Sequence, residues 1–155
     1  MRKIVTGAFV SLDGVMQAPG GPDEDPSGGF EYGGWVAPHF DDKMGAAVDE
    51  MFSEPFDLLL GRKTYDIFAA HWPYAGADDP IGPLFDRITK YVATRNPDLK
   101  LTWQNSQTLG ADAVAAVKKL KGEEGPHLLT QGSTDSFRPC LATTWWMKST
   151  FSFFR

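Results

Sequence analysis

Apolar and polar positions along the first part of the chain follow strand-like runs and helix-like repeats in turn. Residues 3–12 are rich in branched and aromatic side chains and alternate weakly, which predicts a buried strand. Apolar side chains recur at three-to-four spacing over residues 41–52, which predicts a helix that ends before Pro55. The leucine run at 58–60 predicts a second buried strand, closed by Gly61. This succession predicts an α/β fold with a mostly parallel central sheet.

The second half of the chain continues the same pattern. Short apolar runs predict strands at residues 91–94, 102–109 and 127–131, and apolar spacing predicts a helix over 112–120. Residues 72–83 contain three prolines, so we expect a loop there. Strands and helices therefore alternate through most of the sequence.

A long segment rich in glycine and proline follows the first strand. It begins at the Asp13-Gly14 turn signal and runs through Gly34, and a loop of this length is either functional or partly disordered. Its acidic cluster at residues 23–25 is of a kind that could bind a metal ion, but most such clusters are simply solvated. We therefore expect no metal here.

Size and charge limit the partners. The chain has 155 residues, 42% of them hydrophobic, with a formal net charge of −5 and a pI near 5.1. A chain of this size can bury a real core, and we expect one domain. Its acidity does not favour a nucleic acid or an anionic membrane as partner. A ligand that carries phosphate must therefore be held by local donors.

Targeting signals and metal-binding patterns are also missing from the sequence. The apolar run after Arg2 and Lys3 is far too short for a signal peptide or a membrane span, so we expect a cytoplasmic protein. A single cysteine, Cys140, excludes an internal disulfide, and the three histidines show no metal-ligand spacing. We expect a small molecule as the partner, with no metal.

The corner at Gly61 is the first candidate binding site. A strand that ends at a glycine and leads into a helix leaves free N–H groups at the helix N-terminus, which suits a phosphate. Arg62 adds a planar donor fork and Thr64 adds a hydroxyl. The alternative is a plain turn beside a solvated surface charge.

A second corner of the same kind follows the strand at 127–131, at Gly132 and Ser133. Thr94 and Arg95 lie at the C-terminal end of the strand at 91–94, and ligands of open α/β sheets collect at such strand ends. Two glycine corners and a polar strand end in one chain favour a ligand site over two unrelated turns.

Four motifs in this order resemble the dihydrofolate reductase-like superfamily. They are SLDGVM, LLLGRKTY, YVATR and LLTQGSTD. More closely, residues 1–135 look like stand-alone relatives of the reductase domain of the bacterial riboflavin-biosynthesis deaminase-reductase, whose substrate is 5-amino-6-(5-phosphoribosylamino)uracil. The resemblance implies a three-layer dihydrofolate reductase-like fold, an NADPH-dependent reductase of a pyrimidine, pterin or related heterocycle, and a homodimer, as is common among such relatives.

The resemblance also implies roles for the two corners. Gly61, Arg62 and Thr64 would hold the NADPH pyrophosphate together with Gly132 and Ser133. By the same resemblance, Thr94 and Arg95 would receive the adenosine 2′-phosphate and select NADPH over NADH.

Three further residues are candidates for the substrate side. Asp13 matches the family's acidic residue near the nicotinamide, where it would orient the substrate or relay a proton, although a carboxylate after a strand is more often a turn former. Trp35 and Trp72 would wall the substrate pocket, or they are ordinary core or rim aromatics.

One departure from the riboflavin enzymes limits the substrate. Their helix after the first corner leads into an Asp-Pro-x-Leu-x-x-Arg run that contacts the ribityl phosphate, whereas this chain reads YDIFAAHWPYAG. We therefore expect another pterin, pyrimidine or carbonyl substrate, or no riboflavin role. The alternatives to a reductase are a non-catalytic nucleotide-binding module and an inactive truncated gene product.

The last twenty residues differ abruptly from the rest. Residues 136–155 hold six Phe or Trp and none of the chain's twenty acids. The codons that encode Thr144 to Lys148, read in a shifted frame, give Leu, Met or Val followed by Val-Asp-Glu, which is the motif expected in the family at this place. We therefore predict that the reading frame slips near Ser136 and that residues 136–155 are a frameshift product.

Such a slip would remove the family's C-terminal helix and strands. We then expect an exposed edge on the first strand, poor solubility and weaker cofactor binding at the second corner. The alternative is a genuine divergent or membrane-active tail. Sequencing the gene across codons 130–140 distinguishes the two, because an intact frame without family-like downstream codons would contradict the slip.

Overall fold

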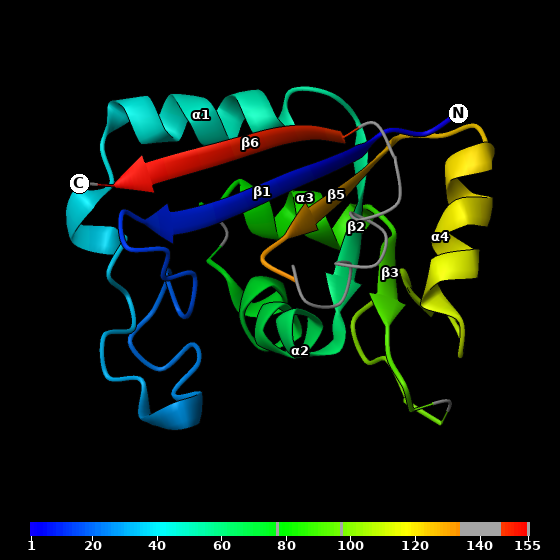
Figure 1. Cartoon of the computed structure of the whole chain (residues 1–155), viewed down its shortest axis with the longest axis horizontal. Helices are drawn as coiled ribbons and strands as arrows, with labels where there is room; N and C mark the ends of the chain where they lie inside the picture. Colours follow the sequence, from blue (N-terminus) through cyan, green and yellow to red (C-terminus); the bar gives the residue numbers. More distant parts are fainter. Residues whose placement is uncertain (77, 97, 134–146, 155) are drawn as a thin grey trace.

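One sheet organises the part of the chain that the structure describes, with the strand order β4-β3-β2-β5-β1-β6 (Figure 1). This computed structural model describes residues 1–76, 78–96 and 98–133, and the backbone of 147–154. Neighbouring strands in it are all parallel, as the sequence predicted. The strands are β1 (Ile4–Ser11), β2 (Phe56–Gly61), β3 (Lys90–Ala93), β4 (Ser106–Thr108), β5 (His127–Gln131) and β6 (Met147–Phe154).

Helices pack on both faces of this sheet. One face carries α1 (Asp42–Phe52), α2 (Arg62–His71) and α3 (Ile81–Arg87), and the other carries α4 (Ala113–Gly122). Short 3-10 helices η1 (Ser27–Gly29), η2 (Ala37–His39) and η3 (Trp72–Tyr74) lie in the connections. The three-layer α/β fold predicted from the sequence is confirmed.

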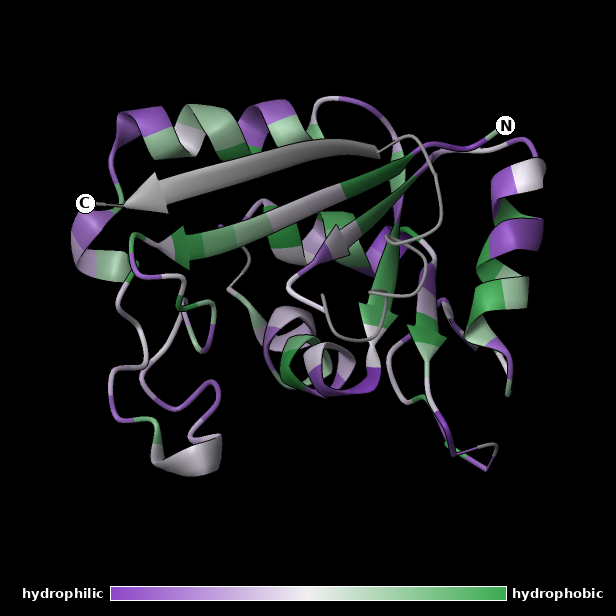
Figure 2. Ribbon diagram, in the orientation of Figure 1, coloured by the Kyte–Doolittle hydropathy of each residue, from purple (hydrophilic) through white to green (hydrophobic). Residues whose placement is uncertain are grey.

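The leucine run of β2 contributes to two separate cores. Leu58 and Leu60 pack with Phe85 of α3, whereas Leu59 packs with Val117 of α4. All five side chains are almost completely buried, and the central strands are strongly apolar in Figure 2. A parallel strand covered on both faces carries a nearly continuous run of apolar side chains, which explains the three leucines.

A buried ion pair joins segments at the N-terminal ends of the strands. The Arg2 guanidinium donates to the Asp57 carboxylate and, at 2.6 Å, to the Pro126 carbonyl. The same carboxylate accepts the Thr89 N–H at 3.1 Å, and the guanidinium lies 5.5 Å from the ring centre of Tyr91. These contacts hold together the starts of β2, β3 and β5.

Lys90, the first residue of β3, is also buried. Its Nζ donates to the Phe85 carbonyl at 2.7 Å and lies 4.3 Å from the ring centre of Trp103. Burial lowers the pKa of Lys90 to about 8, although the nearby Asp86 charge opposes the shift. The ammonium therefore caps the C-terminal end of α3 at a cost in desolvation.

Two local predictions were wrong. Residues 72–83 were predicted to be a loop, but α3 begins at Ile81, where the Asp79 carboxylate accepts the Ile81 N–H at 2.8 Å. Pro83 lies in the first turn of that helix, where a missing N–H costs nothing. The strand predicted over 102–109 is confined to β4, because Trp103 turns into the core instead.

The C-terminal strand differs from expectation. The predicted frame slip near Ser136, and the helix expected to be missing there, lie outside the described residues. The backbone of β6 pairs with β1 from Ile4 opposite Met147 to Ser11 opposite Phe154, so the expectation of a first strand without this neighbour was wrong. Without such a neighbour, the edge of β1 would leave N–H and C=O groups unpaired, and a segment rich in Phe is suited to pair with it.

Candidate functional site

The two glycine corners meet at the C-terminal ends of β2 and β5. The Gly61 N–H donates to the Ser133 hydroxyl oxygen at 3.0 Å, and that hydroxyl donates to Thr64 Oγ1 at 2.8 Å. The Gly132 N–H donates to the Gly7 carbonyl of β1 at 3.2 Å. The structure thus brings four of the predicted phosphate-site residues together, while their role toward a ligand stays a prediction.

The second corner depends on an unusual backbone. Gly132 has φ +64° and Ser133 has φ +26°, both in the left-handed region. Glycine adopts this conformation without strain, and a serine there is uncommon. The turn directs the Ser133 hydroxyl back toward β2, which is how two strand ends become one site.

The N-terminus of α2 differs from those of the other α-helices described. Asp41 accepts a first-turn N–H of α1 and Asp112 one of α4, each at 2.9 Å, and Asp79 does the same for α3. α2 begins after Gly61 with no side-chain cap and no acid in its first turn. Its first-turn N–H groups and the positive end of its dipole therefore fit an anion such as a phosphate.

Arg62 is exposed at this corner. Its Nε donates to both carboxylate oxygens of Asp66, at 2.7 and 2.6 Å, and the two side chains are 43% and 49% exposed. An exposed pair four residues apart on a helix contributes only about 0.3–0.5 kcal/mol. The guanidinium can therefore turn toward a ligand at little cost.

Thr94 and Arg95 follow β3 directly beside the corner. Ala93, the last residue of β3, lies opposite Gly61 in the β2–β3 register. Thr94 Oγ1 accepts the Asn96 N–H at 3.1 Å, and Arg95 is exposed. Both residues thus lie at the same edge of the sheet as the Gly61 corner. A residue that binds a second phosphate of the same ligand would have to lie there.

Asp13 occupies an exposed turn after β1. Its carboxylate accepts a hydrogen bond from the Ser11 hydroxyl, and the Gly14 N–H donates to the Ser11 carbonyl at 2.9 Å. Gly14 has φ +90°, which the turn requires. The turn-forming interpretation describes what this side chain does here, and its catalytic role stays a prediction.

The two tryptophans lie in different surroundings. Trp72 packs edge-to-face against Phe68 and Phe85, with ring centres 6.1 and 5.3 Å apart, so it belongs to the core. Trp35 lies in the long loop, where its Nε1 donates to the Gln17 carbonyl at 2.9 Å. A shared substrate pocket between them stays a prediction.

The long loop after β1 is a folded unit. The Gly34 N–H donates to the Ala18 carbonyl at 2.8 Å and the Val36 N–H to the Pro19 carbonyl at 3.1 Å, which closes the neck. Inside the loop, Gln17 Nε2 donates to the backbone carbonyls of Asp25 and Ser27. Loops with close ends packed by their own side chains are frequently functional.

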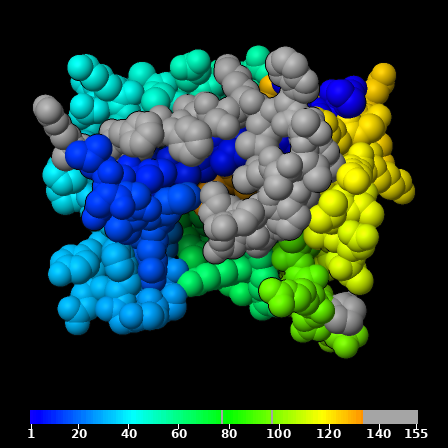
Figure 3. Space-filling view, viewed as in Figure 1, coloured from blue at the N-terminus to red at the C-terminus, as the bar shows by residue number. Residues whose placement is uncertain are grey.

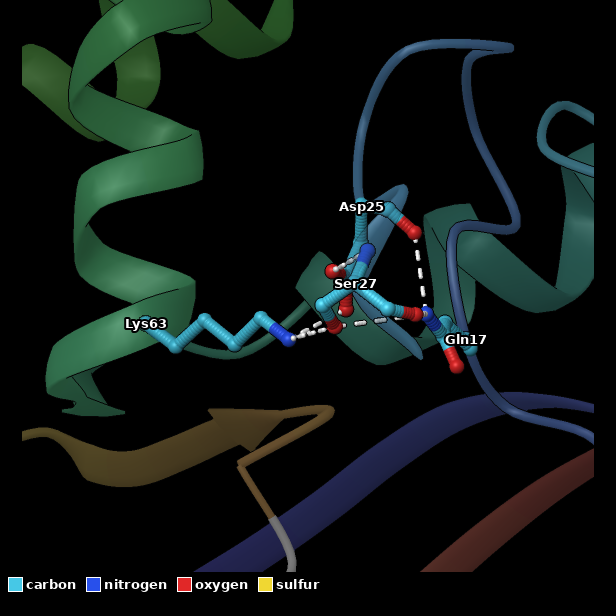
Figure 4. A network of polar contacts seen from close by, with 4 residues as sticks. All are labelled: Gln17, Asp25, Ser27 and Lys63. Atoms are coloured by element: carbon cyan, nitrogen blue, oxygen red, sulfur yellow. Dashed lines mark hydrogen bonds and ion pairs between the residues drawn. The ribbon is translucent and has the colours of Figure 1, made fainter. Parts of the chain in front are cut away.

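Lys63 joins this loop to α2. Its Nζ donates to the Ser27 hydroxyl oxygen at 2.7 Å and lies 2.6 Å from the Asp25 carboxylate (Figure 4). The loop lies beside α2 in the space-filling view as well (Figure 3). Sequence reasoning missed this contact because a surface lysine and a distant acid give no local signal of pairing, although Lys63 lies inside the Gly61–Thr64 motif.

Residues 2–141 match the family model described as the RibD C-terminal domain. The chain belongs to this family. The match ends inside the tail, beyond the predicted frame slip near Ser136. It confirms the reductase-like relatives predicted from the four motifs.

Solved structures give an independent comparison. The chain is similar to a dihydrofolate reductase from Enterococcus faecalis complexed with NADP(H) and RAB-propyl, with a TM-score of 0.57 and 13% identity over 99% of this chain and 72% of that one. At this identity the likeness shows the fold alone. No curated protein matches the sequence significantly. In the part of the chain described, no helix is long and apolar enough to cross a membrane.

Proposed function

We propose that the chain is an NADPH-dependent reductase that transfers a hydride to a pyrimidine, a pterin or a related heterocyclic small molecule. The family and the fold support this proposal. The observation that carries it is the cluster of Gly61, Thr64 and Ser133 beside the uncapped N-terminus of α2. The first-turn N–H groups of α2 and the Thr64 hydroxyl would donate to a pyrophosphate at the strand end where such ligands bind.

Each part of the cofactor has a candidate partner. The pyrophosphate would accept first-turn N–H groups of α2, with Arg62 beside them, and Arg95 would hold the 2′-phosphate. When bound, the nicotinamide supplies the hydride, and the protein has to align the two rings and exclude water. Asp13 would orient the substrate or relay a proton.

The stretch after the first corner offers no lysine or arginine to bind a substrate phosphate. Residues 65–76 carry no Lys or Arg. Phe68 and Trp72, from the same stretch, pack into the core. We therefore propose a substrate without the ribityl phosphate of the riboflavin precursor.

Titration with NADPH, followed by nicotinamide fluorescence, tests the proposal. A reductase should bind NADPH and turn over a pterin or pyrimidine. Tight binding with no turnover would favour a non-catalytic nucleotide-binding module, and no binding at all would favour an inactive gene product. Either result would contradict the reductase assignment.

The preference for NADPH is tested separately. Arg95→Ala should weaken NADPH binding and leave NADH binding unchanged, because only NADPH carries the 2′-phosphate. Arg87→Ala is the control, since Arg87 is also exposed but lies at the end of α3. Equal binding of NADH and NADPH by the unmodified protein would contradict the role of Thr94 and Arg95.

A further inference from the structure

Lys63 belongs to the candidate phosphate corner, and its ammonium is already paired with the carboxylate of Asp25. It is the second residue of α2, between Arg62 and Thr64. Its ammonium reaches across to the Asp25 carboxylate and the Ser27 hydroxyl of the long loop (Figure 4). One of the two cations in the first turn of α2 is therefore used for a contact with the loop.

The two partners of this contact differ in their surroundings. The Asp25 side chain is only 14% exposed, whereas that of Lys63 is 62% exposed. Partial burial pushes the pKa of Asp25 upward, but hydrogen bonds from Lys63 and Ser27 outweigh it and hold this pKa below its ordinary value. The carboxylate is therefore ionised at neutral pH and stays fixed, while the lysine has room to swing away.

The loop fixes this carboxylate in place. Gln17 Nε2 donates to the Asp25 carbonyl at 2.9 Å and to the Ser27 carbonyl at 2.8 Å. The Ser27 N–H donates to Asp25 Oδ1 at 3.2 Å. The acceptors that hold Lys63 thus belong to one folded unit, which is fastened to α2 by a surface contact.

We propose that Asp25 competes with the phosphate ligand for Lys63: the carboxylate holds the ammonium in the free protein, and a phosphate-bearing ligand at the corner takes it over and frees the loop. This inference rests on the proposed function. An ammonium-carboxylate contact whose ammonium is 62% exposed contributes little to stability, so the ammonium is readily exchanged. A phosphate at an uncapped helix N-terminus also gains N–H donors and the helix dipole, which Asp25 does not.

The Asp25→Asn variant tests the competition. Asparagine keeps the oxygen that accepts the Ser27 N–H but removes the charge that holds Lys63. We expect its dissociation constants for NADPH and for inorganic pyrophosphate to fall about two- to five-fold, the ratio that corresponds to a partly exposed ion pair. Its thermal unfolding midpoint checks that the variant is folded.

Asp23→Asn is the matched control, because it makes the same charge change on the same loop at an exposed residue. Its effect should be smaller than that of D25N. In a Lys63→Met background, D25N should no longer change the affinity. Hydrogen exchange of residues 17–36 should rise when NADPH binds to the unmodified protein, and should already be high in free D25N.

The outcomes separate this inference from the proposed function. If NADPH binds all variants equally, or if D25N weakens binding, the competition is wrong and the cofactor assignment stands. If D25N tightens pyrophosphate binding but no variant binds NADPH, the cofactor assignment is wrong and the competition stands. If no variant binds either ligand, both are overturned.

Discussion

Arg2 and Arg62 lie at opposite ends of the sheet, and each is paired with an aspartate. The Arg2–Asp57 pair lies at the N-terminal ends of the strands, with side chains only 3% and 12% exposed. The Arg62–Asp66 pair lies at the C-terminal end of β2, with side chains 43% and 49% exposed. An arginine–aspartate pair is therefore shielded from water at one end of the sheet and exposed to water at the other.

We expect this difference to separate a scaffold from a binding surface. A buried pair that loses one partner leaves an uncompensated charge, so it cannot be given up. An exposed pair is screened by water and contributes little, so its cation is available for a ligand. The following predictions test whether the two ends differ in this way.

The largest effect should come from Asp57→Asn. It leaves the Arg2 guanidinium buried beside a neutral amide, and we expect the free energy of unfolding to fall by about 3–5 kcal/mol. Urea unfolding measures the loss. The NADPH affinity of the folded fraction should not change.

Two variants check the origin of that loss. Asp66→Asn should change stability by less than about 1 kcal/mol, since its partner is exposed. The double variant R2M/D57N should recover much of the lost stability, because both charges are gone. A D57N protein as stable as D66N would contradict the contrast between the two ends.

Lys90 should produce the next largest effect, as a dependence of stability on pH. Its pKa falls from the ordinary value of 10.5 to about 8 on folding. The unfolded chain therefore binds this proton between those pH values and the folded chain does not, so stability should rise with pH across that window. The gain is about 3.5 kcal/mol at most, from about 1.4 kcal/mol per pKa unit.

Lys90→Met should abolish this rise, which urea unfolding at pH 7, 9 and 10.5 would show. Lys118→Met is the matched control, because Lys118 is exposed on α4. The rise should persist in that variant. If K90M and the unmodified protein had parallel pH profiles, the buried lysine would not be the cause.

Arg62→Ala tests the open end of the sheet. If its guanidinium makes a charge-assisted bond to phosphate, NADPH binding should weaken by about 1.5–3 kcal/mol. Stability should change by no more than about 0.5 kcal/mol. Fluorescence titration and urea unfolding measure the two effects, and an unchanged dissociation constant would refute the role.

The smallest effect should come from a helix cap away from the site. Asp112→Ala removes the acceptor of the Ala115 N–H at the start of α4 and should cost about 1 kcal/mol of stability. Its NADPH affinity should equal that of the unmodified protein. A loss of affinity would mean that capping of α4, rather than the missing cap of α2, influences the ligand.

Local patterns predicted much of the fold and of the corner. The leucine run identified β2 because a strand covered on both faces carries a nearly continuous run of apolar side chains, and the glycines at 61 and 132 identified strand ends. Predictions failed where a distant partner decides. Asp79 caps a helix that the prolines seemed to forbid, and Trp103 leaves its predicted strand for the core.

The polar contacts show the same limit. Neither the pairing of Arg2 with Asp57 nor that of Lys63 with Asp25 follows from spacing along the chain. Both depend on which strand ends and loops the topology brings together. The place of a ligand therefore stays a prediction from the sequence, and the internal charges beside that place could not be predicted from it.

The strand order has a consequence for how the chain acquires its fold during synthesis. β5 lies between β1 and β2, with Ile4 opposite Leu128 and Phe56 opposite His127. β1 leaves the ribosome first, but it cannot pair with β5 until nearly the whole described chain has been synthesised. Such distant pairings fold slowly, and the waiting apolar strands are exposed to aggregation. We expect chaperone demand during expression to depend on the time between translation of β2 and translation of β5.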